Sequence, residues 1–442
     1  MGGLTESKLG SVRMLIQLAP DSAIRDLAIA LSSDDPRQPT TQIIRGIVNA
    51  EALDRRARNT VFAPLMPLCG PTVQVRALIF PSSAPAKLWR GLKEEAADDV
   101  QRAIRLVDCQ EWDEVALNRL CARAAVGLRA GSNSHYEAAA ATLNTSPGGA
   151  EAFAACLDLV PIARGALEKL PEWLGRQTEE RVAAARLAFR DAVEVSEDAG
   201  PRLLEILYAH LEEPWLVLRL VSALMHRPTD QYVANSELAS FGERLLDNLD
   251  VQLQALGTFN IDEGVEAGRA ASRCVRAAAM LIAEFDEGVD LSREGPWGSR
   301  IARAKRTLAL GVEGRLKVVE TEVAQALPLG QRGKGGTRGA PRLTADPDQR
   351  SISRALALLT FMQDVRMLSD RIGSGATWTK TSEALAGRLD TYVEDLLEKL
   401  RAGDPAENLD RVRQYLDIAA EFLGLASDEK AAQIVRRRVA AA

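Results

Sequence analysis

Apolar residues recur at helical spacing along almost the whole chain after about residue 84, and this periodicity constrains the fold more than any other feature. Side chains three or four positions apart share one face of a helix, which must then be buried against a neighbour. The stretch after Thr178 shows the pattern, with Glu179 and Glu180 where they complement the helix dipole. Its apolar series is Val182, Ala185, Phe189 and Val193. We therefore predict an all-α protein.

The arrangement of these helices has two equally supported forms. Segments of about 12 to 22 residues are separated by short turns rich in Pro, Gly or Asp, which is typical of antiparallel helix pairs. The segment from Trp215 to Met225 is apolar on nearly every side and belongs in an interior. No fixed repeat period is present. The prediction is a multi-helix array, either solenoid-like or an irregular antiparallel helical bundle.

Breaks in the periodic pattern divide the chain into three blocks. Pro-, Gly- and Ser-containing joints lie at residues 144–149 and 288–298. The predicted blocks are an N-terminal helical region at 1–145, a central helical block at 146–290 and a C-terminal helical block at 291–442. The last block contains a flexible Gly/Arg loop at 330–342, with five glycines and no acid. Residues 34–85 are dense in proline, and their fold stays open.

Composition limits the classes of binding partner and the cellular compartment that we expect. The 442 residues include 55 basic and 61 acidic ones, and the formal charge of −6 is too small to indicate a general nucleic-acid or membrane partner. The five cysteines form no CxxC pair, and no segment approaches the roughly 20 apolar residues that cross a bilayer. The N-terminus lacks the pattern of a secretory signal. We expect a cytoplasmic protein without a transmembrane segment.

Arginine outnumbers lysine by a wide margin. Only 10 of the 55 basic residues are lysine, and alanine is abundant. Both observations are typical of a GC-rich coding bias, which we take as the simpler explanation.

Enzyme signatures are missing from the sequence. The histidines, His135, His210 and His226, form no HExxH motif, and no GxSxG or phosphate-loop pattern is present. We therefore assign no catalytic residue, no metal ligand and no cofactor. An enzyme with an unfamiliar all-helical site around His210 and His226 is kept as an alternative, which requires the two imidazoles to converge.

One local anomaly is basic. The stretch from Trp297 to Arg342 holds ten cations and three acids, whereas the rest of the chain is acidic. A helix that Ser299 caps would place arginines near free backbone N–H groups, and together these groups attract anions. The predicted anion- or partner-binding residues are Arg300, Arg303, Arg306, Arg332, Lys334 and Arg338.

Three interpretations of this basic stretch stay open. Acids of the same chain would neutralise the arginines in the simplest one. An acidic surface of a partner protein is the next, followed by nucleic acid, which usually needs stacking aromatics where only Trp297 is near. We predict a non-enzymatic interaction or scaffold protein that binds a partner protein, with a nucleic-acid-associated or regulatory protein as the alternative.

Overall fold

The computed structural model describes residues 6–32, 39–70, 78–175, 178–225, 228–330, 339–402 and 406–441. Every regular element in these ranges is a helix, and β-type pairing is limited to isolated bridges. The predicted all-α, multi-helix class is therefore confirmed. Within residues 34–85 the structure places most of one long helix and a 3₁₀ helix.

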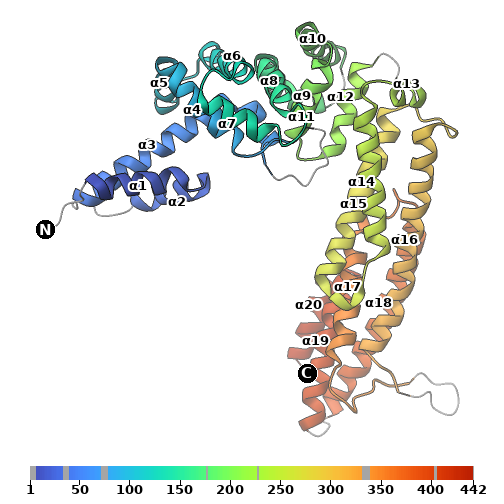
Figure 1. The fold of residues 1–442 in the computed structure, drawn as a ribbon. Coiled ribbons are helices and arrows are strands. Elements are labelled where there is room, and N and C mark those ends of the chain that lie inside the picture. Colours follow the sequence, from blue (N-terminus) through green and yellow to red (C-terminus); the bar gives the residue numbers. More distant parts are fainter. Residues whose placement is uncertain are drawn as a thin grey trace. The chain divides into compact units, whose positions relative to one another are not determined.

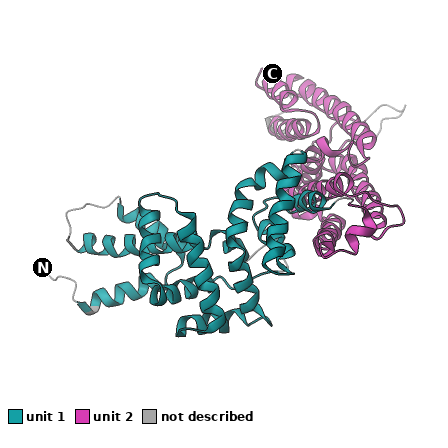
Figure 2. Ribbon diagram, turned by 90° about the horizontal axis from the view of Figure 1, so that it is seen from above, with its two compact units in different colours: residues 1–226 teal, residues 227–442 magenta. Residues whose placement is uncertain are grey.

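The chain forms two compact units, Met1–His226 and Arg227–Ala442, which Figure 2 shows in different colours. The predicted division into three blocks stays a prediction, because contact density alone does not establish which parts fold independently.

Unit 1 (Met1–His226) is an array of mostly short helices in which neighbours along the chain pack against each other (Figure 1). The helix predicted after Thr178 begins at Glu179, and Thr178 caps it by accepting a hydrogen bond from the backbone N–H of Arg181. The helices are α1 (Glu6–Leu18), α2 (Asp21–Ser32), α3 (Pro39–Val61), η1 (Ala63–Leu68), α4 (Ala84–Glu95), α5 (Ala97–Asp108), α6 (Glu114–Ala130), α7 (Ser134–Leu143), α8 (Gly149–Asp158), α9 (Val160–Leu174), α10 (Glu179–Val195), α11 (Ala199–Ala209), η2 (Pro214–Leu216) and α12 (Val217–Leu224).

Unit 2 (Arg227–Ala442) is built around longer helices (Figure 1), of which α14, α15 and α16 pack side by side and α17 covers α15 and α16. Its helices are α13 (Asp230–Ala234), α14 (Ala239–Gly257), η3 (Ile261–Glu263), α15 (Val265–Gly288), α16 (Pro296–Ala326), α17 (Gln349–Asp364), η4 (Arg366–Leu368), α18 (Gly375–Ala402), α19 (Ala406–Ala426) and α20 (Glu429–Ala440). None of the helices in the described ranges is long and apolar enough to span a bilayer.

The base of the predicted Gly/Arg loop is closed by backbone pairing. The Gly330 N–H donates to the carbonyl of Ala340 at 2.8 Å, and the Arg342 N–H donates to the carbonyl of Pro328 at 3.0 Å. Residues 331–338, at the centre of the loop, lie outside the described ranges. Since α17 and α18 both pack on α16, the loop joins helices of one bundle.

Arginine side chains close the C-terminal ends of helices that they do not belong to. The last carbonyls of a helix lack partners within it, and a buried carbonyl without a donor is costly. Guanidinium groups supply donors at five such ends: Arg55 at α1, Arg164 at α3, Arg219 at α9, Arg186 at α12 and Arg315 at α14. Arginine is favoured because one fork can reach several carbonyls. The arginine excess therefore has a structural use that its composition did not reveal.

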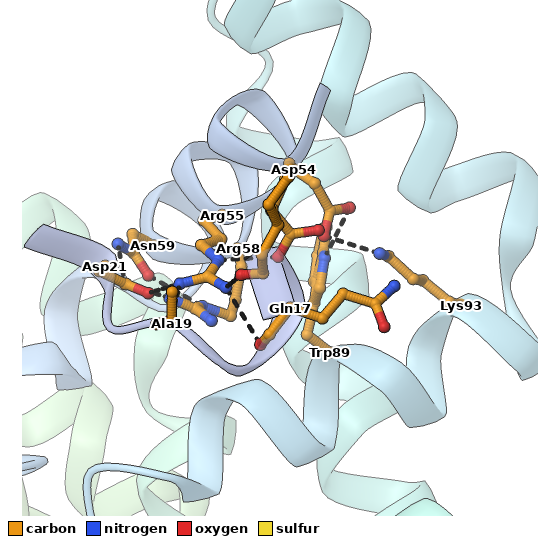
Figure 3. A network of polar contacts seen from close by, with 11 residues as sticks. Gln17, Ala19, Asp21, Asp54, Arg55, Arg58, Asn59, Trp89 and Lys93 are labelled. Carbon is orange, nitrogen blue, oxygen red and sulfur yellow. Dashed lines mark hydrogen bonds and ion pairs between the residues drawn. The ribbon is translucent and has the colours of Figure 1, made fainter. Parts of the chain in front are cut away.

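Arg55 shows this arrangement most fully (Figure 3). Its guanidinium donates to the carbonyls of Ile16, Gln17 and Ala19 at the end of α1, at 2.6 to 3.1 Å. The carboxylate of Asp21, at the start of α2, accepts from the same group at 3.0 Å. One side chain of α3 thus holds the turn between α1 and α2.

Arg164 joins α9 to the end of α3 in the same way. Its side chain is 6% exposed, and it donates to the carbonyls of Thr60 and Val61 and to the side chain of Asn118. The indole of Trp112 lies over its guanidinium, with 5.5 Å from the guanidinium carbon to the ring centroid. One face of the guanidinium and its donors are therefore engaged.

Replacing Arg164 by methionine should destabilise unit 1. The variant removes the guanidinium donor from the Thr60 and Val61 carbonyls and leaves the Val61 carbonyl with the weak thiol donor of Cys121, so we expect a loss of about 2–4 kcal/mol in the free energy of unfolding. Urea unfolding followed by circular dichroism measures the change. Arg105→Met on the exposed side of α5 is the matched control and should shift it by less than about 0.5 kcal/mol. Equal losses in the two variants would contradict the role assigned to Arg164.

Candidate functional site

The first three of the predicted basic residues lie on α16, but this helix begins earlier in the sequence than predicted. The helix runs from Pro296, with Gly295 as its N-cap, so the predicted cap at Ser299 is wrong. The rigid φ angle of proline suits the first position of a helix. Arg300 therefore lies in the second turn of α16, one turn beyond the free N–H groups. Three further predicted residues, Arg332, Lys334 and Arg338, lie outside the described ranges.

An internal carboxylate already occupies the N-terminus of α16. Asp230, the first residue of α13, is 1% exposed, and its two oxygens accept from the backbone N–H groups of Trp297 and Gly298 at 3.0 Å each. The Asp230 backbone is itself held by Asp290, whose carbonyl accepts its N–H at 3.0 Å. The predicted use of this helix end for an outside anion is therefore wrong, because the anion that fills it belongs to the chain.

Small residues and one buried tryptophan shape this end of α16. A Cβ at Gly295 would lie 1.9 Å from the Asp230 carboxylate, and a Cβ at Gly242 would lie 2.3 Å from the ring of Trp297. The Trp297 indole is 1% exposed and donates to Glu243 at 2.5 Å. Because Trp297 is buried, it cannot stack on a nucleotide base, which removes the aromatic that a nucleic-acid site would have used.

Arg300 is neutralised inside unit 2. Its guanidinium pairs with three carboxylates of α14, those of Glu243 at 3.0 Å, Asp247 at 2.9 Å and Asp250 at 2.7 Å. Partial burial lowers the pKa of Arg300, but the hydrogen bonds from Asp247 and Asp250 outweigh it, and the net shift is upward. For this residue the first of the three open interpretations, pairing with acids of the same chain, is confirmed.

Arg303 and Arg306 have a different environment. Both are exposed on α16 and form no ion pair within the described ranges. They share a stripe of the helix with residues at intervals of three or four, opposite the buried positions Ile301, Leu308 and Val312. We call this stripe the outer face of α16; it consists of Arg303, Arg306, Leu310, Gly314 and Lys317.

The outer face of α16 combines positive charge with apolar surface. Leu310 is 70% exposed, and a Cβ at Gly314 would meet no atom within 4 Å. Lys317 pairs only with Glu313 one turn earlier, at 3.6 Å. A glycine in the middle of a helix costs roughly 1 kcal/mol relative to alanine, and no contact within the described part of the chain offsets that cost at Gly314. Together, these features suit contact with a partner that approaches closely.

The histidines and metal-ligand types show no comparable arrangement. The ring of His210 contacts the carbonyl of Pro64 at 2.9 Å, and His135 lies 3.2 Å from Glu94 on the surface. His226 lies outside the described ranges, so the convergence that an enzyme site would need stays a prediction. Within those ranges, no group of three or more His, Cys, Asp or Glu side chains is placed to hold a metal ion.

Unit 1 has an apolar surface that the sequence did not mark. A groove of about 950 Å³ lies along α3, lined by α2 and by Trp112. Nearby, Met14, Leu15 and Leu18 of α1 are 63% to 74% exposed. Among the described residues of α1, α2 and α3, the buried members of their hydrophobic cluster are Ile16, Ile24 and Val48. Exposure of these side chains depends on which helices cover α1, and helical periodicity does not contain that information.

Similarity to known proteins gives no evidence about this geometry. The chain matches no family model, no curated protein and no solved structure. Its function must therefore be argued from its own residues.

Replacing Asp230 by alanine should destabilise unit 2. The N–H groups of Trp297 and Gly298 would lose a buried charged acceptor, and we expect a loss of about 2–4 kcal/mol in the free energy of unfolding. Denaturant unfolding is the measurement. Asp286→Ala, which removes an exposed carboxylate paired with Lys305, is the control and should change stability by less than about 1 kcal/mol. An unchanged unfolding midpoint for the Asp230 variant would disprove the anchoring role.

Proposed function

We propose that this chain is a non-enzymatic helical interaction protein that holds an acidic protein partner on the outer face of α16. The observation that carries the proposal is the contrast between neighbouring arginines of one helix. Arg300 is paired with three carboxylates, whereas Arg303 and Arg306 point outward beside the exposed side chain of Leu310. A scaffold role in the cytoplasm, as expected from the sequence, is part of the proposal.

A protein surface suits this face better than nucleic acid does. The face offers apolar contact area at Leu310, and Trp297, the aromatic residue of α16 itself, is buried. Protein interfaces combine apolar contact with charged rims, whereas single-stranded nucleic acid usually requires exposed aromatics. Nucleic-acid binding is retained as an outcome that the experiment below can reveal.

Reversing both charges of the outer face should abolish capture of the partner. In affinity capture from native cells, we expect the variant Arg303→Glu/Arg306→Glu to retain at most about a tenth of the protein held by the wild type, because each unfavourable charge contact costs a sizeable part of the binding free energy. Capture at low and high salt, with and without nuclease, identifies the kind of partner. Loss of the captured material after nuclease treatment would indicate nucleic acid instead of protein.

The control changes the same charges at the same spacing on another helix. Arg273 and Arg276 are exposed on α15, three residues apart, and form no ion pair within the described ranges. The variant Arg273→Glu/Arg276→Glu should capture as much partner as the wild type. The proposal is disproved if the α16 variant also keeps every captured partner.

The stability of the Gly314→Ala variant tests whether the outer face of α16 is open at this position. Alanine should raise the free energy of unfolding by about 0.5–1 kcal/mol, because the added methyl group meets open space and restricts the unfolded chain. Thermal unfolding measures the gain, and Gly298→Ala is the contrasting variant. A Cβ at Gly298 would lie 1.9 Å from the carbonyl oxygen of Ser292, so that variant should be destabilised. A destabilised Gly314→Ala protein would show that the outer face is not open.

A further inference from the structure

A row of carboxylates borders the outer face of α16. Glu243, Asp247 and Asp250 lie on α14 at intervals of four and three residues, so they share one side of that helix. Their side chains are 48%, 70% and 64% exposed. Among the residues that the structure describes, Arg300 is the one cation that pairs with the row, so two of its three negative charges are left uncompensated there. We call these three residues the acidic row of α14.

Helices α14 and α16 run parallel, and the offset between residues that lie side by side is constant along them. The ring of Trp297 on α16 lies over Gly242 on α14, and Gly311 on α16 lies beside Leu256 on α14. Trp297 and Gly311 are separated along α16 by as many residues as Gly242 and Leu256 are along α14, and each helix rises about 1.5 Å per residue. Arg303 and Arg306 therefore lie level with residues 248–251 of α14, which is the height of Asp247 and Asp250.

Because the arginines of α16 and the carboxylates of α14 lie at the same height along the two helices, the surface that they form together is complementary to that of a second copy. A two-fold axis that lies in the interface, parallel to α14 and α16 and midway between them, lays α16 of one copy over α14 of the other and keeps the heights along the helices unchanged. Two arginines of each outer face then meet the uncompensated carboxylates of the opposite acidic row. The contact occurs twice, as a symmetric interface requires.

We propose that the partner on the outer face of α16 is a second copy of this chain, with Arg303 and Arg306 of each copy on Asp247 and Asp250 of the other. This inference rests on the proposed function, since it names the occupant of the same face. The chain itself supplies both complementary halves, at the same level and side by side.

The neighbouring charged and apolar groups are compatible with this arrangement. Lys317 and Glu313 of α16 compensate each other. Arg244 of α14 lies over the ring of Phe241, with its guanidinium carbon 4.5 Å from the ring centroid. Val251, which follows the acidic row, is 60% exposed and adds apolar surface that the contact covers. Because the attraction is mainly between exposed charges, the dimer should weaken as salt is added.

Sedimentation velocity of the full chain tests the inference. At low salt we expect a monomer–dimer equilibrium, and at about 0.5 M salt the dissociation constant should rise at least about tenfold. The variants Arg303→Glu/Arg306→Glu and Asp247→Lys/Asp250→Lys should each be monomeric, because like charges then face each other. The matched control, Arg273→Glu/Arg276→Glu, should dimerise like the wild type.

Mixing the two charge-reversed variants provides the decisive measurement. Each contact between them again joins opposite charges, so the mixture should form a heterodimer although neither component dimerises alone. Circular dichroism and the unfolding midpoint of each variant check that both remain folded. A wild-type chain that stays monomeric at low salt up to about 100 μM, or charge-reversed variants that still dimerise alone, would overturn the inference.

The outcomes for the dimer and for the proposed function are distinguishable. A monomeric wild type that captures another protein, and loses it in the Arg303→Glu/Arg306→Glu variant, disproves the dimer and supports the proposed function. Restored heterodimers support the dimer even if no other protein is captured. If neither self-association nor capture depends on Arg303 and Arg306, both proposals are wrong.

Discussion

The structure depends on how the ends of its helices are satisfied. An all-helical chain with many short elements buries several helix ends, and each end carries backbone groups without partners in its own helix. Arginines such as Arg55 and Arg164 donate to the C-terminal carbonyls of α1 and α3, and Asp230 accepts from the N-terminus of α16. Each contact joins two helices, so satisfying a helix end also fixes how neighbouring helices pack.

The same requirement decides which charges remain for binding. Asp230 fills the N-terminus of α16, and the acidic row of α14 neutralises Arg300, so neither this helix end nor Arg300 is available to a partner. Arg303 and Arg306 lie on the opposite side of α16 from the core and are left outward. A basic stretch that looks uniform in sequence is thus divided into an internal part and an external part. Only the external part supports the proposed interaction.

Much of the fold could be predicted because helix signals are local. The helix after Thr178 begins where the sequence places it, at Glu179. The predicted start of α16 is wrong. Ser299 lies inside the helix, because Pro296 takes the first helical position, which suits its fixed φ angle. The coding-bias explanation of the arginine excess missed its structural use, because the carbonyls that these side chains reach are remote in sequence, as with Arg164 and Val61.

By itself, the sequence determined the all-α class, the start of the helix after Thr178, the weak overall charge and the presence of a basic stretch. These properties follow from composition and from spacing over a few residues. Only the tertiary structure decided that Asp230 meets Trp297, that Arg300 meets Asp247, and that Arg303 stays outward. The partners in those contacts are more than fifty residues apart, and their meeting depends on which helix faces pack together. Local periodicity specifies that a face is buried, but it does not specify against what.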